Sequence, residues 1–183
     1  FFLVGHSMGG KVAMQLVSMM SSVYKSNSLV VKKLVVLDIA PKMYPRQHDE
    51  ILAGLNSVDC KSIKSRGDAE HVLMSHITDK ALIGFLLKSL RPVQGGFEWQ
   101  FNLDVITGSY ENILAAPMID VELVLPALFL KGDQSDYIQD EDESLIRDFF
   151  VNVRIEQIKQ AGHWLHAEQP EKVLESIKLF INE

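Results

Sequence analysis

The sequence contains a single cysteine, Cys60, so no disulfide can form within the chain. Cys60 stands in a polar stretch without the spacing of metal ligands, and a reducing compartment is expected. Acidic residues outnumber basic ones, and the net charge of −6 argues against binding to nucleic acid or to an anionic membrane surface. No apolar run approaches the about 20 residues that a membrane-spanning helix needs. We therefore expect a cytoplasmic protein without a membrane span or a metal site.

A serine flanked by glycines stands near the start of the chain. Residues 5–9 read Gly5-His6-Ser7-Met8-Gly9, an apolar run precedes them, and apolar residues at helical spacing follow. The pattern Gly-x-Ser-x-Gly between a strand and a helix is typical of the nucleophile elbow of α/β hydrolases. Such a sharp turn strains the serine backbone, and close packing of strand on helix favours glycine on either side. We predict that Ser7 is a nucleophile and that Gly5 and Gly9 are required for packing.

The rest of the sequence predicts a parallel sheet that is interrupted by an insert. The apolar run at 34–37 follows the elbow helix and a polar loop at 21–28, which completes a β-α-β unit. Further strands are predicted at 123–130 and 153–158, and further helices of this part at 141–150 and 170–181. The last helix is amphipathic, with Val173, Leu174, Ile177, Phe180 and Ile181 expected to face inward.

Strand signals are rare between about residues 45 and 120. Helices are predicted there at 49–55, 68–77, 79–90 and 104–114. The first three begin with an aspartate that can cap the helix, and Arg91-Pro92 is expected to end the third. An alternating stretch at 95–101 predicts a short strand or an extended lip. We expect an α/β-hydrolase core formed by residues 1–44 and 121–183, with a helical cap over 45–120.

Six histidines are available to act as the base for a serine nucleophile. His163 is the candidate because it follows the last predicted strand, between Gly162 and Trp164, where a loop can bring its imidazole to Ser7. The resulting chain order of serine, acid and histidine is that of α/β hydrolases. His6 belongs to the elbow and is expected to line the pocket.

The acid of a catalytic triad has more than one candidate. In most α/β hydrolases it follows the strand after the cap in the pattern Gly-x-x-Asp, but here the stretch Gly132-Asp133-Gln134-Ser135 has serine at that position. Asp133 and Asp136 flank the serine and remain alternatives. Asp38 ends the strand that follows the elbow helix, and active sites of parallel sheets form at that edge. Asp38 is therefore the favoured acid.

Three motifs together resemble the bacterial YbfF-type esterases, α/β hydrolases that are related to a mitochondrial abhydrolase-domain protein. The resemblance covers essentially the whole chain, and Tyr44-Pro45 and Ile51-Leu52-Ala53-Gly54-Leu55 also fit it. The three motifs are Gly5-His6-Ser7-Met8-Gly9-Gly10-Lys11, Leu37-Asp38-Ile39-Ala40-Pro41 and Ala161-Gly162-His163-Trp164-Leu165-His166-Ala167-Glu168. The resemblance implies esterase or thioesterase activity on small acyl substrates, no cofactor, and Asp38 as the acid.

Two features depart from that family. Its Trp-Arg-Phe-Asn motif is Trp99-Gln100-Phe101-Asn102 here, so any arginine contact with an anionic substrate group is lost. The family carries a His-Gly oxyanion loop upstream of the elbow, and this sequence has no His-Gly dipeptide. Because the elbow stands at the first residues, we expect the chain to be the C-terminal part of a longer protein and to be inactive alone.

These residues predict a serine hydrolase mechanism. Ser7 would attack the carbonyl carbon, His163 would move the proton, Asp38 would orient the imidazole, and the Met8 backbone N–H would donate to the oxyanion. The alternatives are a cofactor-free peroxidase of the same fold and a non-catalytic ligand-binding module. The residues expected to line the pocket are His6, Trp99, Phe101 and Trp164.

Overall fold

A computed structural model describes residues 1–23 and 31–183 of the chain. It divides into two compact units, of which the first comprises Phe1–Met43 and Ala115–Glu183, and the second comprises Tyr44–Leu114. The second unit therefore ends before residue 115 rather than at residue 120. The first helix continues to Val23, and the rest of the loop predicted over 21–28 lies outside the described residues.

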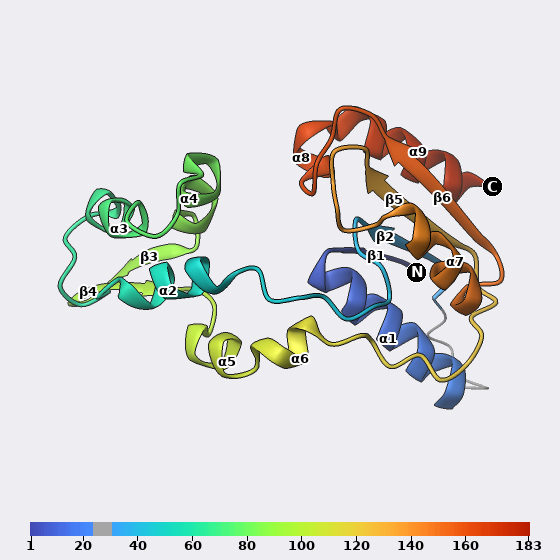
Figure 1. Cartoon of the computed structure of the whole chain (residues 1–183), viewed down its shortest axis with the longest axis horizontal. Coiled ribbons are helices and arrows are strands. Elements are labelled where there is room, and N and C mark those ends of the chain that lie inside the picture. Colours follow the sequence, from blue (N-terminus) through green and yellow to red (C-terminus); the bar gives the residue numbers. More distant parts are fainter. Residues whose placement is uncertain (24–30) are drawn as a thin grey trace. The chain divides into compact units, whose positions relative to one another are not determined.

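The first unit contains a parallel four-stranded sheet with the order β1-β2-β5-β6 (Figure 1). The predicted parallel sheet is therefore confirmed. Its strands are β1 (Phe2–His6), β2 (Lys33–Leu37), β5 (Ala127–Gly132) and β6 (Val153–Ile158). Its helices are α1 (Met8–Val23), α7 (Asp140–Phe149), α8 (Leu165–Glu168) and α9 (Pro170–Asn182).

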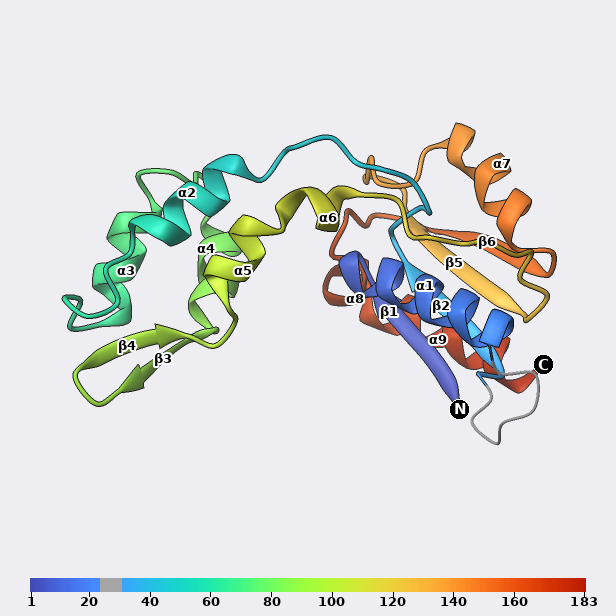
Figure 2. The same cartoon turned by 90° about the horizontal axis from the view of Figure 1, so that it is seen from below.

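Helices cover both faces of this sheet, with α9 on one face and α1 and α7 on the other (Figures 1 and 2). Successive side chains of a strand point to opposite faces. The residues that pack with α8 and α9 include Val35, Leu37, Leu128 and Leu130. The residues between them in sequence are also fully buried, which explains the uninterrupted apolar runs of β2 and β5.

Two details of this unit differ from the sequence prediction. The strand predicted over 123–130 begins only at Ala127, because Pro126 has no N–H to donate to a neighbouring strand. Leu123 forms only an isolated bridge, with Phe150. In α9, Leu174 is 50% exposed instead of facing inward, whereas Val173 and Phe180 are buried as predicted.

The second unit contains five helices and one hairpin within its described residues, all of Tyr44–Leu114. Strands β3 (Leu90–Val93) and β4 (Gly96–Trp99) pair in an antiparallel hairpin. The helices are α2 (Asp49–Ser57), α3 (Arg66–Leu73), α4 (Lys80–Leu87), α5 (Leu103–Gly108) and α6 (Tyr110–Leu114). An apolar core of its own, built around Leu55, Leu73, Ile83 and Leu90, holds these elements together.

Several predicted helix limits in this unit are wrong for identifiable reasons. Helix α3 is capped by Ser65, and Asp68 occupies the third helical position of a capping box instead of the cap. Helix α4 does begin after the predicted cap Asp79, but it ends at Leu87 because Leu90 already pairs in the hairpin.

The helix predicted over 104–114 is divided into α5 and α6. Ser109 lies between them with φ −110° and ψ 16°, outside helical geometry. Gly108, which directly precedes Ser109, is a poor helix former, which explains the break. Asn102 caps α5 by accepting a hydrogen bond from the N–H of Val105.

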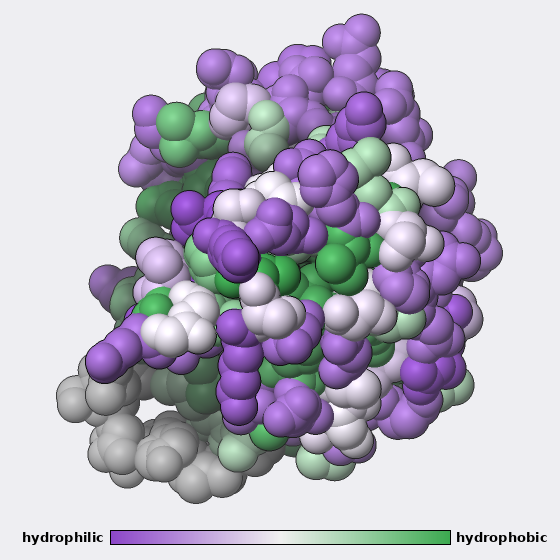
Figure 3. All heavy atoms as spheres, turned by 90° about the vertical axis from the view of Figure 1, so that its left-hand side faces the viewer, coloured by the Kyte–Doolittle hydropathy of each residue, from purple (hydrophilic) through white to green (hydrophobic). Residues whose placement is uncertain are grey.

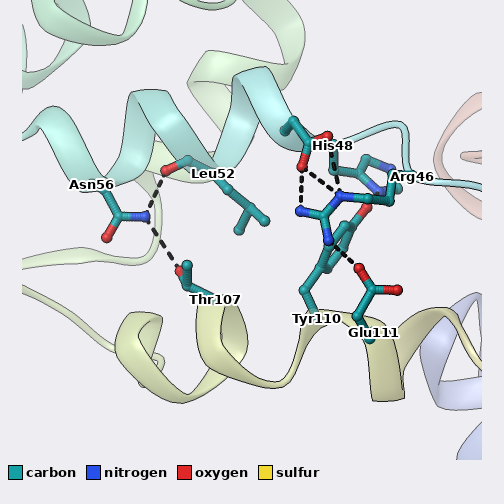
Figure 4. A network of polar contacts seen from close by, with 8 residues as sticks. Arg46, His48, Leu52, Asn56, Thr107, Tyr110 and Glu111 are labelled. Atoms are coloured by element: carbon teal, nitrogen blue, oxygen red, sulfur yellow. Dashed lines mark hydrogen bonds and ion pairs between the residues drawn. The ribbon is translucent and has the colours of Figure 1, made fainter.

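A polar network joins the two ends of the second unit to each other (Figure 4). Arg46 pairs with Asp49 and with Glu111 of α6, and its guanidinium lies 4.8 Å from the ring centre of Tyr110. His48 Nδ1 lies 2.7 Å from the hydroxyl of Tyr110. His48 thus joins the start of the second unit to α6.

Hydrophilic and hydrophobic side chains both lie on the face of the molecule drawn in Figure 3. Polar side chains surround smaller apolar areas on that face. Large apolar side chains of the second unit that remain exposed are Met74, Phe85, Val93 and Val105. Because single exposed apolar residues are normal on protein surfaces, these carry no functional meaning by themselves.

Candidate active site

Ser7 stands on a sharp turn between β1 and α1, as the elbow motif predicts. Its φ is 53°, in the left-handed region that L-residues rarely adopt. A Cβ added at Gly5 would lie 2.3 Å from the carbonyl oxygen of Gly9, so glycine is required there. At Gly10 an added Cβ would lie 2.5 Å from a side-chain carbon of Ile39.

The glycine requirement predicted for Gly9 is wrong. Apart from its chain neighbours and the backbone of its own helix, no atom of the described residues lies within 4 Å of a Cβ built on Gly9. Gly9 contributes its backbone, which Gly5 approaches closely, and Gly10 is the second position where a side chain is excluded.

Ser7 and Asp38 are neighbours because they follow adjacent parallel strands. His6 of β1 is in register with Leu37 of β2, and the N–H of Ser7 donates to the carbonyl oxygen of Leu37 at 3.0 Å. Each residue is the first after its strand, at the carboxyl edge of the sheet, where sites in such folds form. Asp38 also has a positive φ, of 51°.

Ser7, His163 and Asp38 form a continuous hydrogen-bonded chain. His163 Nε2 lies 2.9 Å from Ser7 Oγ, and His163 Nδ1 lies 2.8 Å from Asp38 Oδ2. The Asp38 side chain is fully buried, and that of His163 is 18% exposed. The structure therefore brings together the three residues that the sequence predicts as the triad, in the order that the chemistry needs.

Asp38 receives two further hydrogen bonds from the loop after β5. The N–H of Gly132 donates to Asp38 Oδ1 at 3.0 Å, and the Ser135 hydroxyl donates to Asp38 Oδ2. The motifs of the sequence assign no role to Ser135, although it occupies the last position of the Gly-x-x-Asp pattern. That position alone could have indicated a side chain next to the triad.

The alternative acids lie elsewhere. Asp133 Oδ1 accepts from the N–H of Ala161 at 3.1 Å, and Asp136 is exposed. Asp133 therefore fixes the loop that carries His163. Gly132 lies so close to this loop that an added Cβ would be 2.4 Å from the carbonyl oxygen of Gly162.

His6 braces the backbone of His163. His6 Nε2 donates to the carbonyl oxygen of His163 at 2.8 Å, and burial lowers the pKa of His6 although this hydrogen bond opposes the shift. The His6 ring also lies 5.3 Å from that of Trp164 and 4.5 Å from that of His166. The pocket-lining role predicted for His6 and Trp164 stays a prediction, and their observed contacts support the histidine loop.

Met8, the predicted oxyanion donor, is the first residue of α1. The N–H groups of a first helical turn have no partner within the helix, so the position suits an anion. Trp99 and Phe101 lie in the second unit, where their rings stack at 5.4 Å. Their placement in a substrate pocket stays a prediction.

Neither a metal cluster nor a membrane helix is found in the described parts of the chain. Across residues 1–23 and 31–183, no group of three His, Cys, Asp or Glu side chains is arranged to bind a metal ion. No helix over these residues has both the length and the apolar character to cross a bilayer.

An elbow serine on a helix-flanked parallel sheet, bonded to a loop histidine, defines the α/β-hydrolase class. A family model described as "Alpha/beta hydrolase family" matches residues 1–176. The chain belongs to this family, and the predicted fold class is confirmed.

Three known proteins illustrate the similarity. Esterase YbfF of Escherichia coli strain K12 is 37% identical over 181 residues, which is 98% of this chain and 66% of that protein. The mouse sn-1-specific diacylglycerol lipase ABHD11 is 33% identical over 98% of this chain and 58% of its own length. A solved structure titled "Marine microorganism esterase" has a TM-score of 0.88 at 39% identity, covering 97% of this chain and 68% of that one. The resemblance to YbfF-type esterases is thus confirmed, and the chain spans less than two thirds of these two curated relatives.

Proposed function

We propose that the protein is a serine hydrolase that cleaves carboxylic esters or acyl thioesters. The observation that carries the proposal is the chain of hydrogen bonds from Ser7 through His163 to the buried Asp38. Relatives named as an esterase and a diacylglycerol lipase support small ester substrates. A diacylglycerol is an oxygen ester, and neither name mentions a thioester.

The proposed reaction has two steps through an acyl-enzyme. Ser7 Oγ attacks the carbonyl carbon while His163 Nε2 takes the hydroxyl proton, and His163 then returns that proton to the leaving alcohol or thiol. Asp38 holds the tautomer with the proton on Nδ1 and stabilises the imidazolium. In the second step His163 activates a water that releases the acid and frees Ser7.

The Met8 backbone N–H is the proposed donor to the oxyanion. It belongs to the helical turn that directly follows the nucleophile, where the helix dipole also favours negative charge. The second unit, Tyr44–Leu114, is the proposed cap, and its stacked Trp99 and Phe101 are proposed to form apolar wall for the acyl group.

A fluorophosphonate probe tests the nucleophile in the intact protein. We expect the probe to label Ser7, and Ser7→Ala to abolish labelling and lower kcat by several orders of magnitude, up to about 10⁶-fold. Hydrolysis is measured with p-nitrophenyl esters and with acyl thioesters of matched chain length. The thioester arm decides between the two substrate classes.

Ser144→Ala is the matched control for this experiment. Ser144 is an exposed residue of α7 whose hydroxyl donates to a backbone carbonyl in its own helix. Its loss is expected to leave labelling and turnover unchanged. Labelling at a serine other than Ser7 would contradict the proposal, and a folded protein that neither labels nor hydrolyses would favour a ligand-binding module.

A further inference from the structure

The ring of Tyr137 lies flat against the imidazole of His163. The two ring centres are 3.7 Å apart and the ring planes differ by 16°. Tyr137 belongs to the loop between β5 and α7, outside the elbow and outside the histidine loop. None of the hydrogen bonds of the proposed triad involves it.

The loop that carries Tyr137 is tied to the acid of the triad. The N–H of Tyr137 donates to Ser135 Oγ at 3.3 Å, and the Ser135 hydroxyl in turn donates to Asp38. The next residue, Ile138, is 3% exposed and anchors the loop in the core. The same segment that supports Asp38 therefore fixes the position of the Tyr137 ring.

The two hydrogen bonds of the His163 ring do not themselves restrain one motion of that ring. Both bonds lie at the ring edge, through Nδ1 and Nε2, so the imidazole can still tilt about the line that joins these atoms. The His6 ring is 4.7 Å away at an angle of 40°, and the Trp164 ring is 5.9 Å away at 68°. These angled contacts restrain the tilt less than a parallel face at van der Waals distance.

We propose that Tyr137 is a positioning residue, whose ring face holds the His163 imidazole in the plane of the Asp38–His163–Ser7 chain and stabilises the imidazolium. The inference rests on the proposed function, because the imidazolium forms only if His163 accepts the Ser7 proton. An aromatic face attracts a cation that lies over it. The ring, and not the hydroxyl, performs this role.

Two substitutions separate the ring from the hydroxyl. Tyr137→Leu removes the aromatic face and is expected to lower kcat about 5- to 30-fold, the range of a cation–π contact. KM is expected to stay the same for short and long acyl esters alike, and the rate of fluorophosphonate labelling at Ser7 is expected to fall with kcat. Tyr137→Phe keeps the face and is expected to stay within about twofold of the wild type.

Ile146→Val is the control for a general loss of packing. It shortens a fully buried side chain of α7, outside the loop that carries Tyr137, and should lower the melting temperature but not kcat. If Tyr137→Leu does not fold, Tyr137→Met fills the site with a flexible apolar side chain and is compared with Tyr137→Phe instead.

The outcomes separate this inference from the proposed function. If the wild type is active and Tyr137→Leu keeps the same kcat, the inference is overturned while the proposed function stands. The same holds if Tyr137→Phe loses as much kcat as Tyr137→Leu. A KM increase confined to long acyl chains assigns Tyr137 to substrate binding and also overturns it. A folded wild type that neither labels nor hydrolyses overturns the proposed function and this inference with it.

Discussion

Two side chains of the candidate site stand on left-handed backbone. Ser7 and Asp38 have φ values of 53° and 51°, and each follows its strand directly. Such a conformation costs on the order of 1–3 kcal/mol for a residue other than glycine and persists only where the surroundings enforce it. Here the hydrogen bond from Ser7 N–H to Leu37 and that from Asp38 N–H to Leu130 hold the two turns side by side. This arrangement aims both side chains at the same imidazole.

Asp38→Asn tests the acid at the scale of a single residue. The amide cannot hold the required tautomer of His163, so kcat is expected to fall by about 10³–10⁴-fold, as loss of the orienting acid does in serine proteases. The measurement is ester hydrolysis, together with a thermal melt that shows the variant to be folded.

The neighbouring acids provide the controls. Asp133→Asn retains an oxygen that can accept from the N–H of Ala161, and Asp136 is exposed, so both asparagine variants should keep most of the activity. A crippled Asp136→Asn beside a near-normal Asp38→Asn would place the acid after β5 instead.

What the sequence predicts about single residues depends on how local the signal is. Ser7 can be recognised from a five-residue motif, and His163 from its place after the last strand. Asp38 is ambiguous in sequence because its distance from His163 depends on the order of strands in the sheet. The hydrogen bond of Ser135 could be anticipated only from its place in the Gly-x-x-Asp pattern. The ring contact of Tyr137 joins loops distant in sequence, and no local pattern indicates it.

At the scale of elements, the limits of β6 could be predicted from the sequence, whereas the start of β5, all of β3 and several helix limits could not. The limits of β6 agree with the prediction because alternation marks both ends. The start of α3 was missed because either Ser65 or Asp68 could cap, and only the structure shows that they form one capping box. The packing of glycines is equally hard to predict from sequence. The Gly-x-Ser-x-Gly motif does not tell which glycine lies too close to a neighbour to carry a side chain, and Gly9 does not.

Helix α1 carries a lysine whose environment predicts a pH effect on stability. Lys11 is 8% exposed, its ammonium donates to the carbonyl oxygen of Ala115 at 2.8 Å, and burial lowers its pKa from 10.5 to about 8. Between these two values the unfolded chain keeps a proton that the folded protein has released. The contribution of Lys11 to the free energy of unfolding should therefore rise with pH across this window.

Lys11→Met is expected to remove this rise. The difference in unfolding free energy between wild type and variant is measured by denaturant titration at several pH values from about 7.5 to 10.5, the window set by the shifted group. Lys172→Met is the control, because Lys172 is exposed and its ammonium also donates to a backbone carbonyl. Its difference in unfolding free energy from the wild type should not rise with pH in the same way. A difference that stays constant with pH for Lys11→Met would show that burial does not perturb the ammonium.

The whole molecule consists of two units with separate cores. Ser7, Asp38 and His163 all belong to the first unit, whereas Trp99 and Phe101 belong to the second. The loss of strand signals along the sequence predicts that an insert exists. The side chains that meet the substrate depend on contacts that no periodicity encodes, so the pocket could not be predicted in the same way.

The connections between the units make the second one replaceable. The chain enters it at Tyr44 and leaves it at Leu114, and the N–H of Tyr44 donates to the carbonyl oxygen of Leu114 at 2.9 Å. A short Gly-Ser linker from Met43 to Ala115 can therefore replace Tyr44–Leu114 without stretching the first unit.

In the protein that carries this linker, we expect fluorophosphonate labelling of Ser7 to persist, because every hydrogen bond of the proposed triad lies within the first unit. The dependence of kcat/KM on acyl chain length should become weaker, because the proposed apolar wall is removed. A series of p-nitrophenyl esters of increasing chain length measures this dependence. Ser7→Ala in the shortened protein controls for non-specific labelling. A shortened protein that is folded by circular dichroism but no longer labels would show that the triad geometry depends on the second unit, whereas an unchanged chain-length preference would remove Trp99 and Phe101 from the pocket.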